Sequence, residues 1–402
     1  MNVLVVNCGS SSIKYSLFDM TDPRSPAVRA SGLVERIGEE TSVLGHEAGG
    51  RVDRREAEAP DHRAAFALMV QALTEGEAAV VASPDEIDAV GHRVVHGGER
   101  FAESIRIDDE VIGAIEQFAT LAPLHNPPNL TGIRAAMALM PAVPHVAVFD
   151  TAFHQTLEPH AYLYALPYDL YRDHGIRRYG FHGTSHRYVS EAAVEMLGKA
   201  AGEVNLITAH LGNGCSAAAV RGGRCVDTSL GMTPLEGLVM GTRSGDVDPA
   251  IVFYLVRALG MDVDEVDDLL NRRSGLLGVS GVSNDMRELT RAAEEGNERA
   301  DLAIRLFCHR LRKYIGAYTA ELGRVDALVF TGGIGENAAH IRRRTCDGLE
   351  PLGYVLDAEA NAASADGPRD VAAARSPSRI LVIPTDEEAM IARDTARIAA
   401  QR

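Results

Sequence analysis

NLITAHLGNGCS (residues 205–216) has the same design as NVLVVNCGSSS (residues 2–12) near the start of the chain. Each segment is a short apolar strand that leads into a loop of glycine and small residues. Each is followed by a second strand, at residues 13–18 and 216–220. A strand–loop–strand element that recurs about two hundred residues further on predicts a duplicated domain with two facing phosphate-binding loops.

A third glycine loop, TGGIGEN (331–337), follows the apolar strand 327–330 and precedes a short helical segment. Backbone N–H groups and serine hydroxyls in such loops cradle phosphate oxygens, and Lys14 adds a point charge. The GxxxxGK[ST] spacing of a Walker A loop is absent. Singly, such loops are more often a plain hairpin or a tight turn than a phosphate site. Together they indicate a nucleotide held in a cleft between two related halves, and phosphoryl transfer is the leading hypothesis.

Size, charge and cysteine usage narrow the class of protein. A chain of 402 residues fits two domains, and 46% hydrophobic with 24% charged residues is ordinary for a soluble enzyme. A net charge of −16 argues against binding to nucleic acid or to an anionic membrane. Five cysteines without CxxC spacing disfavour disulfides and zinc, and they fit a reducing cytoplasm. No signal peptide or membrane-spanning run is expected.

The periodicity of apolar residues predicts several elements. Helices are expected at 64–73, from an N-cap at Ser185 to about Leu197, at 300–322, and from about Glu387; buried strands are expected at 87–95, 146–149 and in the final ILVIP segment. Residues 36–62 are polar and indicate a peripheral loop or edge structure. The prolines of LAPLHNPPN (121–129) predict a fixed loop without helix or strand.

Several polar residues stand where chemistry is expected. Arg93 interrupts an apolar strand, which places it at a sheet edge or facing a polar site. Asp150 closes another apolar strand, at the end where α/β sheets carry reactive groups. GMTPLEGLVMGTRSGDVDP (231–249) is long and irregular, which predicts a binding surface, and Arg243 lies between two of its glycines. The alternative for Arg243 is a surface salt bridge to Asp246 or Asp248.

Nine motifs in order resemble the acetate kinase family: NCGSSSIK, RVVHGGE, LAPLHNPPN, VFDTAFH, RRYGFHGTSHRYV, HLGNGCS, GMTPLEGLVMGTRSGDVDP, FTGGIGENA and PTDEE. The resemblance implies an α/β fold of two duplicated ribonuclease-H-like domains, as in actin, Hsp70 and sugar kinases, with mixed sheets, flanking helices and the active-site cleft between them. The expected domains are residues 1–150, with the C-terminal helix 386–402 packed back on them, and residues 151–385. It further implies a cytoplasmic homodimer and the reaction ATP + acetate ⇌ ADP + acetyl phosphate with Mg²⁺, Mn²⁺ being the other candidate metal.

The resemblance also assigns roles to residues. Asn7 and Glu387 would position the metal, although Glu388 leaves the second assignment open by one position. Ser10, Ser12 and Lys14 would hold phosphates; His210, Leu211, Gly212, Asn213, Gly214, Gly333, Ile334, Gly335, Glu336 and Asn337 would bind ATP; and Asp285, Met286 and Arg287 would flank the adenosine. Arg93 would take the acetate carboxylate, and Val95, Leu124, Phe181 and Pro234 would surround the acetate methyl group. His182 and Arg243 would stabilise the transition state with His125 nearby, while Asp150 would either orient the arginines or act as an acid/base.

These roles are physically coherent. A carboxylate is already a nucleophile at neutral pH, so alignment and charge neutralisation are the main tasks, and Arg suits both. We therefore favour orientation as the role of Asp150. Two alternatives remain: a propionate or butyrate kinase, because one methylene in an apolar pocket is worth only about 1–3 kcal/mol, and a nucleotide-gated scaffold like actin or Hsp70, which would not need Arg93, Arg243 and His182.

Overall fold

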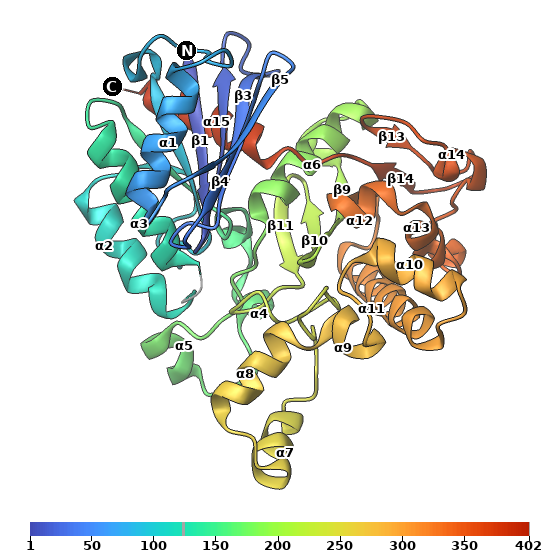
Figure 1. Ribbon diagram of the computed structural model, residues 1–402. Helices are drawn as coiled ribbons and strands as arrows, with labels where there is room; N and C mark the ends of the chain where they lie inside the picture. Colours follow the sequence, from blue (N-terminus) through green and yellow to red (C-terminus); the bar gives the residue numbers. More distant parts are fainter. Residues whose placement is uncertain (123–124, 402) are drawn as a thin grey trace. The chain divides into compact units, whose positions relative to one another are not determined.

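The computed structural model describes residues 1–122 and 125–401. The chain forms two compact units, Met1–Ala152 together with Asp386–Arg402, and Phe153–Thr385 (Figure 1). The C-terminal segment therefore belongs with the first unit. No helix of the described residues is long and apolar enough to cross a bilayer.

The first unit is built on an eight-stranded mixed sheet with the order β5-β4-β3-β2-β1-β6-β8-β7. Its strands are β1 (Asn2–Cys8), β2 (Ser12–Asp19), β3 (Ala27–Glu35), β4 (Ser42–Ala48), β5 (Arg51–Ala57), β6 (Ala89–Val94), β7 (Ile105–Arg106) and β8 (His145–Phe149). β1 pairs antiparallel with β2 and parallel with β6, which is parallel to β8. The polar segment that follows β3 forms β4 and the edge strand β5.

The second unit repeats this topology in a six-stranded sheet with the order β11-β10-β9-β12-β14-β13. The strands are β9 (Asn205–Leu211), β10 (Cys215–Arg221), β11 (Arg224–Thr228), β12 (Ala327–Thr331), β13 (Arg369–Asp370) and β14 (Arg379–Val382). β9 pairs antiparallel with β10 and parallel with β12, as β1 does with β2 and β6. The order β3-β2-β1-β6-β8-β7 is thus reproduced strand for strand, which confirms the predicted duplication.

Helices cover the sheets because the central strands are apolar on both faces. In the first unit these are α1 (His62–Thr74), α2 (Asp109–Gln117), α3 (Asn126–Leu139) and α15 (Glu387–Ala399). On one face, Leu4 and Val6 of β1 share a core with α1 and α3. On the other face, Val3 and Val5 pack against α15, which lies with the first-unit strands in Figure 1.

The second unit has a larger set of helices. They are α4 (Pro159–Tyr162), α5 (Tyr168–His174), α6 (Gly183–Leu197), α7 (Ala250–Leu259), α8 (Val263–Arg272), α9 (Gly275–Ser280), α10 (Met286–Glu294), α11 (Glu298–Leu322), α12 (Gly332–Asn337), α13 (Ala339–Cys346) and α14 (Ala358–Ala362). Helix α6 packs through Val189 and Ala193 against β9 and β12. Between β11 and α7 the chain has no helix or strand, as the glycine- and proline-rich sequence predicts.

Three local predictions were wrong. Helix α3 begins at Asn126, inside the segment predicted as a loop, because Pro127 and Pro128 occupy the first turn, where no backbone N–H is needed. Helix α6 begins after His182, and Ser185 lies inside it, since the Ser185 hydroxyl bonds to His210 instead of capping. The glycine loop at 331–337 is not a turn: residues Gly332–Asn337 form the short helix α12, with Thr331 as N-cap.

Candidate active site

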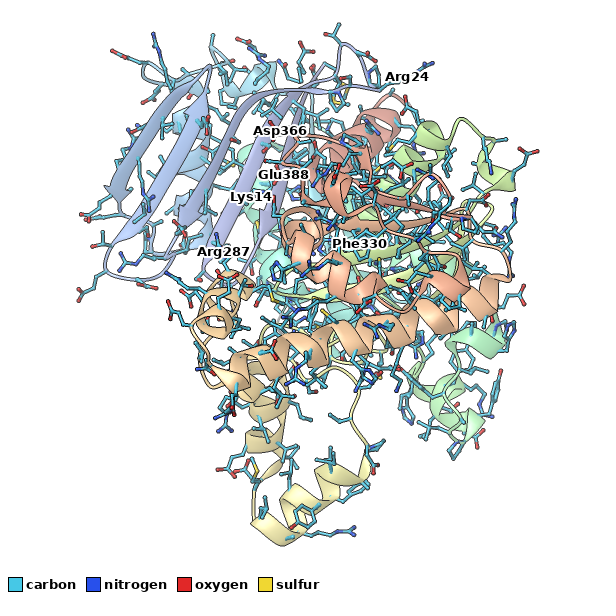
Figure 2. The ribbon with its side chains drawn as sticks, turned by 90° about the vertical axis from the view of Figure 1, so that its right-hand side faces the viewer. Lys14, Arg24, Arg287, Phe330, Asp366 and Glu388 are labelled. Carbon is cyan, nitrogen blue, oxygen red and sulfur yellow. The ribbon has the colours of Figure 1, made fainter. Side chains whose placement is uncertain are left out.

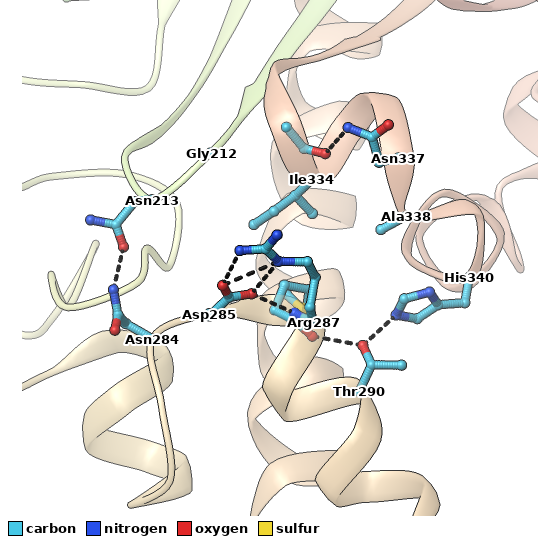
Figure 3. Close-up of a pocket in the computed structure, with 12 residues that line it drawn as sticks. Gly212, Asn213, Asn284, Asp285, Arg287, Thr290, Ile334, Asn337, Ala338 and His340 are labelled. Carbon is cyan, nitrogen blue, oxygen red and sulfur yellow. Dashed lines mark hydrogen bonds and ion pairs between the residues drawn. The ribbon is translucent and has the colours of Figure 1, made fainter. Parts of the chain in front are cut away.

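The second unit contains a pocket of about 740 Å³ where its two glycine segments meet (Figure 3). The loop between β9 and β10 contributes Gly212 and Asn213, and α12 contributes Gly333, Ile334 and Asn337. The start of α10 closes another side with Asp285, Met286 and Arg287. Eight residues that the resemblance assigns to ATP therefore line one pocket.

Polar contacts fix the walls of this pocket. Arg287 Nη2 lies 2.6 Å from Asp285 Oδ2, and this hydrogen-bonded pair lowers the pKa of Asp285 to about 2. Asn284 donates to Asn213 Oδ1 at 2.9 Å, which ties α10 to the β9–β10 loop (Figure 3). Gly241 lies so close to Asn213 Oδ1 that a Cβ there would collide with it. The planar Arg287 side chain is 91% exposed, a surface on which a flat base can stack.

Other residues that the resemblance assigns to ATP do not line the pocket and make contacts elsewhere in the second unit. Glu336 Oε1 accepts from the backbone N–H of Gly332 at 2.8 Å and of Thr385 at 3.2 Å, so it fixes the start of α12. His210 Nδ1 lies 2.8 Å from Ser185 Oγ. Leu211, Gly214 and Gly335 lie in the same segments but do not line the pocket.

Arg243 has no carboxylate partner among the described residues. Its Nη1 donates to the carbonyl of Pro234 at 3.3 Å, while burial lowers the pKa of the guanidinium. The predicted alternative, a salt bridge to Asp246 or Asp248, is wrong. Asp246 pairs with Arg310 at 3.0 Å and accepts from Tyr314, and Asp248 accepts from the backbone N–H of Ala250. A half-buried cation that, among the described residues, is bound to a carbonyl and to no carboxylate is suited to an anionic ligand.

His182 lies beside Arg243 and the β9–β10 loop. A Cβ placed on Gly214 would be 3.5 Å from His182 Nε2 and 3.8 Å from Arg243 Nη1, so both side chains face this glycine. His182 has φ 56°, a left-handed conformation that is uncommon outside glycine and is typical of functional positions. Its ring stacks on His210 with centroids 4.5 Å apart.

In the first unit, Arg93 and Asp150 form a two-pronged ion pair. Arg93 Nε donates to Asp150 Oδ1 at 3.0 Å and Nη2 donates to Oδ2 at 2.6 Å. Asp150 is 1% exposed, and its charge raises the pKa of Arg93, with Glu387 adding to the effect. Arg93 stands on the interior strand β6, so it faces a polar site and not a sheet edge.

The two glutamates at the start of α15, Glu387 and Glu388, have different surroundings. Glu388 Oε1 lies 2.7 Å from Lys14 Nζ, and its Oε2 accepts from Ser16 Oγ at 2.7 Å; Lys14 and Glu388 are neighbours in Figure 2. Glu387, in contrast, has a buried Oε1 without a hydrogen-bond partner in the described part of the chain. An orphaned carboxylate oxygen suits a hydrated divalent cation, which takes oxygen ligands and keeps several waters. Within the described residues, no cluster of three or more His, Cys, Asp or Glu side chains is arranged to hold a metal.

The remaining predicted residues of the first unit lie around the ends of β1 and β6. Ser10 is exposed at the tip of the β1–β2 loop, Ser12 begins β2, and Asn7 is opposite Lys14 in the hairpin. The Val95 N–H donates to Asn129 Oδ1 at the start of α3, the turn that follows His125. Leu124 lies outside the described residues. In the second unit, Phe181 is 1% exposed and its carbonyl bonds to His154.

The sequence analysis did not identify some of the candidate functional residues. Thr290 and His340 also line the pocket and lie 3.0 Å apart. Thr290 could have been found, because it follows Met286 by one helical turn and shares its face. Ser216, which bonds to His182, and His186, which bonds to Ser216, are brought together by the fold. They carry no local signal except the repeated histidines of FHGTSH.

The repeated strand order and the glycine-lined pocket define an α/β protein of two related units, of which the second has a pocket suited to a nucleotide. The sequence matches the acetokinase family over residues 2–393, and the chain belongs to this family. It is 56% identical over 398 residues to the acetate kinase of Clostridium novyi (strain NT), covering 99% of this chain and 98% of that protein.

Solved structures agree with this assignment. The crystal structure of Porphyromonas gingivalis acetate kinase superposes with a TM-score of 0.94 at 48% identity, with 99% of both chains covered. A propionate kinase from Francisella tularensis subsp. tularensis SCHU S4 superposes with a TM-score of 0.92 at 43% identity, again over 99% of both chains. The fold is therefore shared by enzymes named for two neighbouring carboxylic acids.

Proposed function

We propose that this member of the acetokinase family transfers the γ-phosphoryl group of ATP to acetate, reversibly and directly, giving ADP and acetyl phosphate. The second-unit pocket would hold the nucleotide, with Asp285, Met286 and Arg287 beside the adenosine. Arg93 would bind the acetate carboxylate, oriented by Asp150. His182 and Arg243 would neutralise charge on the equatorial oxygens of the phosphoryl group as it moves.

The observation that carries this proposal is Arg243, a half-buried cation without a carboxylate partner among the described residues, next to the ring of His182 at Gly214. A scaffold that only binds nucleotide would have no use for an uncompensated guanidinium beside a strained histidine. A phosphoryl-transfer enzyme needs fixed donors for the charge that develops in the transition state. Acetate needs no strong base, which agrees with Asp150 being fully engaged by Arg93.

Family membership implies a divalent metal, and we propose Mg²⁺, with Mn²⁺ as the other candidate. Glu387 is the carboxylate we assign to it, because Glu388 is occupied by Lys14 and Ser16, while Glu387 Oε1 is buried and has no hydrogen-bond partner among the residues that the structure describes. Asn7 would supply an amide oxygen or orient a bound water. When bound, the metal would neutralise phosphate charge. We assign phosphate contacts to Ser10, Ser12 and Lys14.

The test is an ATP-dependent assay that traps acetyl phosphate as the hydroxamate. Wild type should form product from acetate, and Arg243→Ala should lower kcat by about 10³-fold or more, the range for a transition-state arginine. The KM for ATP should change little. Arg272→Ala, at an exposed arginine on α8 that pairs with Asp268, is the control and should match wild type. Wild-type turnover in Arg243→Ala would favour a nucleotide-binding scaffold.

Acyl-chain preference needs its own comparison, because relatives with the same fold are named for acetate and for propionate. We propose acetate, with Val95, Phe181 and Pro234, and Leu124 from outside the described residues, around the methyl group. Values of kcat/KM for acetate, propionate and butyrate decide it. A higher value for propionate or butyrate would reassign the substrate.

We also propose a cytoplasmic homodimer. The five cysteines are free and buried, which suits a reducing compartment. Helix α7 has no buried residue and exposes Ile251, Phe253, Tyr254 and Leu259. A second copy of the chain is the occupant we assign to this apolar helix.

A further inference from the structure

A chain of hydrogen bonds behind His182 runs through the interior of the second unit. His182 Nδ1 lies 2.8 Å from Ser216 Oγ, and Ser216 Oγ lies 2.8 Å from His186 Nε2. His186 Nδ1 in turn lies 2.7 Å from Thr208 Oγ1. Thr208, His186 and Ser216 are all fully buried. The four side chains are contributed by β9, β10 and α6.

Thr208, at the end of this hydrogen-bond chain furthest from His182, determines which group donates in each hydrogen bond. The hydroxyl of Thr208 always carries a proton, and within the described residues its one partner is His186 Nδ1. If His186 Nδ1 were protonated, it would donate to Thr208 and leave a buried hydroxyl proton unpaired, which is unfavourable. Thr208 therefore donates to His186 Nδ1.

The remaining donors follow from this first one. A neutral imidazole carries a single N–H, so His186 must be protonated on Nε2 and donate to Ser216 Oγ. Ser216, having accepted there, donates its own proton to His182 Nδ1. Burial and the neighbouring histidines lower the pKa of His186 well below its usual value, so His186 stays neutral.

We infer that the chain Thr208–His186–Ser216 fixes His182 as the Nε2–H tautomer, so that neutral His182 presents an N–H donor at Gly214. Thr208, His186 and Ser216 are positioning residues, because none of them faces Gly214 as His182 does. The functional meaning of this tautomer rests on the proposed role of His182 in phosphoryl transfer. The assignment of the tautomer itself does not depend on that role. A neutral donor would serve a phosphoryl oxygen without requiring the imidazolium, so turnover would not be lost as the pH rises above the usual histidine pKa of about 6.5.

The primary test is ¹⁵N NMR of histidine-labelled protein at pH 8, with the His182 signals identified by their loss in His182→Gln. Wild type should show a protonated Nε2 and an unprotonated Nδ1 on His182. A protonated Nδ1 in wild type would overturn the inference whatever the activity. The measurement itself is made on wild type, and only the signal assignment uses a variant, so it does not depend on the folding of variants at Thr208, His186 or Ser216.

Variants then test the direction of donation. Thr208→Val keeps the shape of the side chain but removes the first donor. The Nε2–H form should then no longer be the predominant tautomer of His182. The kcat at pH 8 should fall by about tenfold at most, the effect of one hydrogen bond. Ser216→Ala should make kcat decline as pH rises from 6 to 8, because an unfixed ring depends more on the imidazolium. Thr228→Val is the matched control: it removes a buried hydroxyl that donates to the Ala217 carbonyl at 3.1 Å, outside the chain.

The control separates positioning from general packing. Thr228→Val should leave both the His182 tautomer and the pH profile of kcat as in wild type. Equal effects of Thr208→Val and Thr228→Val would contradict the inference. Failure of the proposed function has a different signature, because His182→Ala would then keep wild-type kcat while the tautomer of His182 in wild type would be unaffected.

Discussion

Both carboxylate oxygens of Asp150 bind the Nε–Nη2 edge of the Arg93 guanidinium, and this geometry distinguishes two roles for the carboxylate. A group that already accepts two hydrogen bonds at 3.0 and 2.6 Å from a cation is poorly placed to take a proton from substrate. We predict that Asp150→Asn raises the KM for acetate by about 10- to 100-fold, the loss expected for a hydrogen bond to a charged group. The measurement is steady-state kinetics with acetate varied, and kcat should fall far less than KM rises.

A double-mutant cycle supplies the control for Asp150. If Asp150 acts through Arg93, then adding Asp150→Asn to Arg93→Ala should have little further effect on kcat/KM for acetate. Additive losses would mean that Asp150 acts on its own. A collapse of kcat with unchanged KM in Asp150→Asn would point to acid/base chemistry instead. Thermal unfolding of each variant shows whether an uncompensated buried charge has also destabilised the first unit.

At the scale of elements, two adjacent glycines of α12 have different reasons to be glycine. Gly332 has φ 74°, and a Cβ there would lie 2.8 Å from the Leu211 carbonyl oxygen. Gly333 has no atom within 4 Å of its Cβ position and lines the pocket. Gly332→Ala should lower the free energy of unfolding by about 1–3 kcal/mol, whereas Gly333→Ala should leave it unchanged or slightly higher.

For ADP affinity we expect the reverse of the order expected for stability, with the larger effect in Gly333→Ala. Gly333→Ala places a methyl group in the space that a nucleotide would enter, so the Kd for ADP should rise by about tenfold or more while stability is kept. Thermal unfolding and calorimetric titration with ADP give both readouts. Unchanged ADP affinity in Gly333→Ala would remove α12 from the nucleotide site.

The elements also show which parts of the fold the sequence could predict. The repeated strand–glycine loop predicted the duplicated sheets, because apolar strands and hairpins are encoded by neighbouring residues. Helix starts were harder: the prolines at 127 and 128 were interpreted as breakers, although a first turn needs no N–H. Ser185 matched an N-cap, but its hydroxyl bonds to His210 on β9, a partner brought near only by folding.

Site residues follow the same rule. Arg93, Asp150 and Arg243 stood out because a charged residue contrasts with its local sequence, whereas the role of His182 came from the resemblance alone. Thr208 and Ser216 did not, since hydroxyls in apolar strands are common and their connection to His182 depends on the packing of α6 on β9. Glu387 and Glu388 are adjacent and chemically identical, so only their surroundings distinguish the paired carboxylate from the unpaired one.

At the scale of the whole molecule, the two units share six strands in one order but differ in what is added to them. The first unit extends its sheet by β4 and β5, while the second inserts α7, α8 and α9 after the irregular segment that carries Arg243. Most side chains of helix α7 are apolar, yet none of its residues is buried. An apolar helix that its own unit leaves uncovered requires another surface, because contiguous exposed apolar patches are rare on monomers.

We predict that the chain sediments as a dimer of twice 43.1 kDa and that Phe253→Lys combined with Tyr254→Lys yields monomers. Phe253 and Tyr254 are 57% and 62% exposed, so the substitutions should not affect the thermal stability of the unit itself. Burying lysines without partners at an interface costs more than surface contacts return. Val52→Lys, at a 70% exposed position on the edge strand β5, is the control and should remain dimeric. Sedimentation velocity reads out all three proteins, and a monomeric wild type or a dimeric double variant would rule out α7 as the interface.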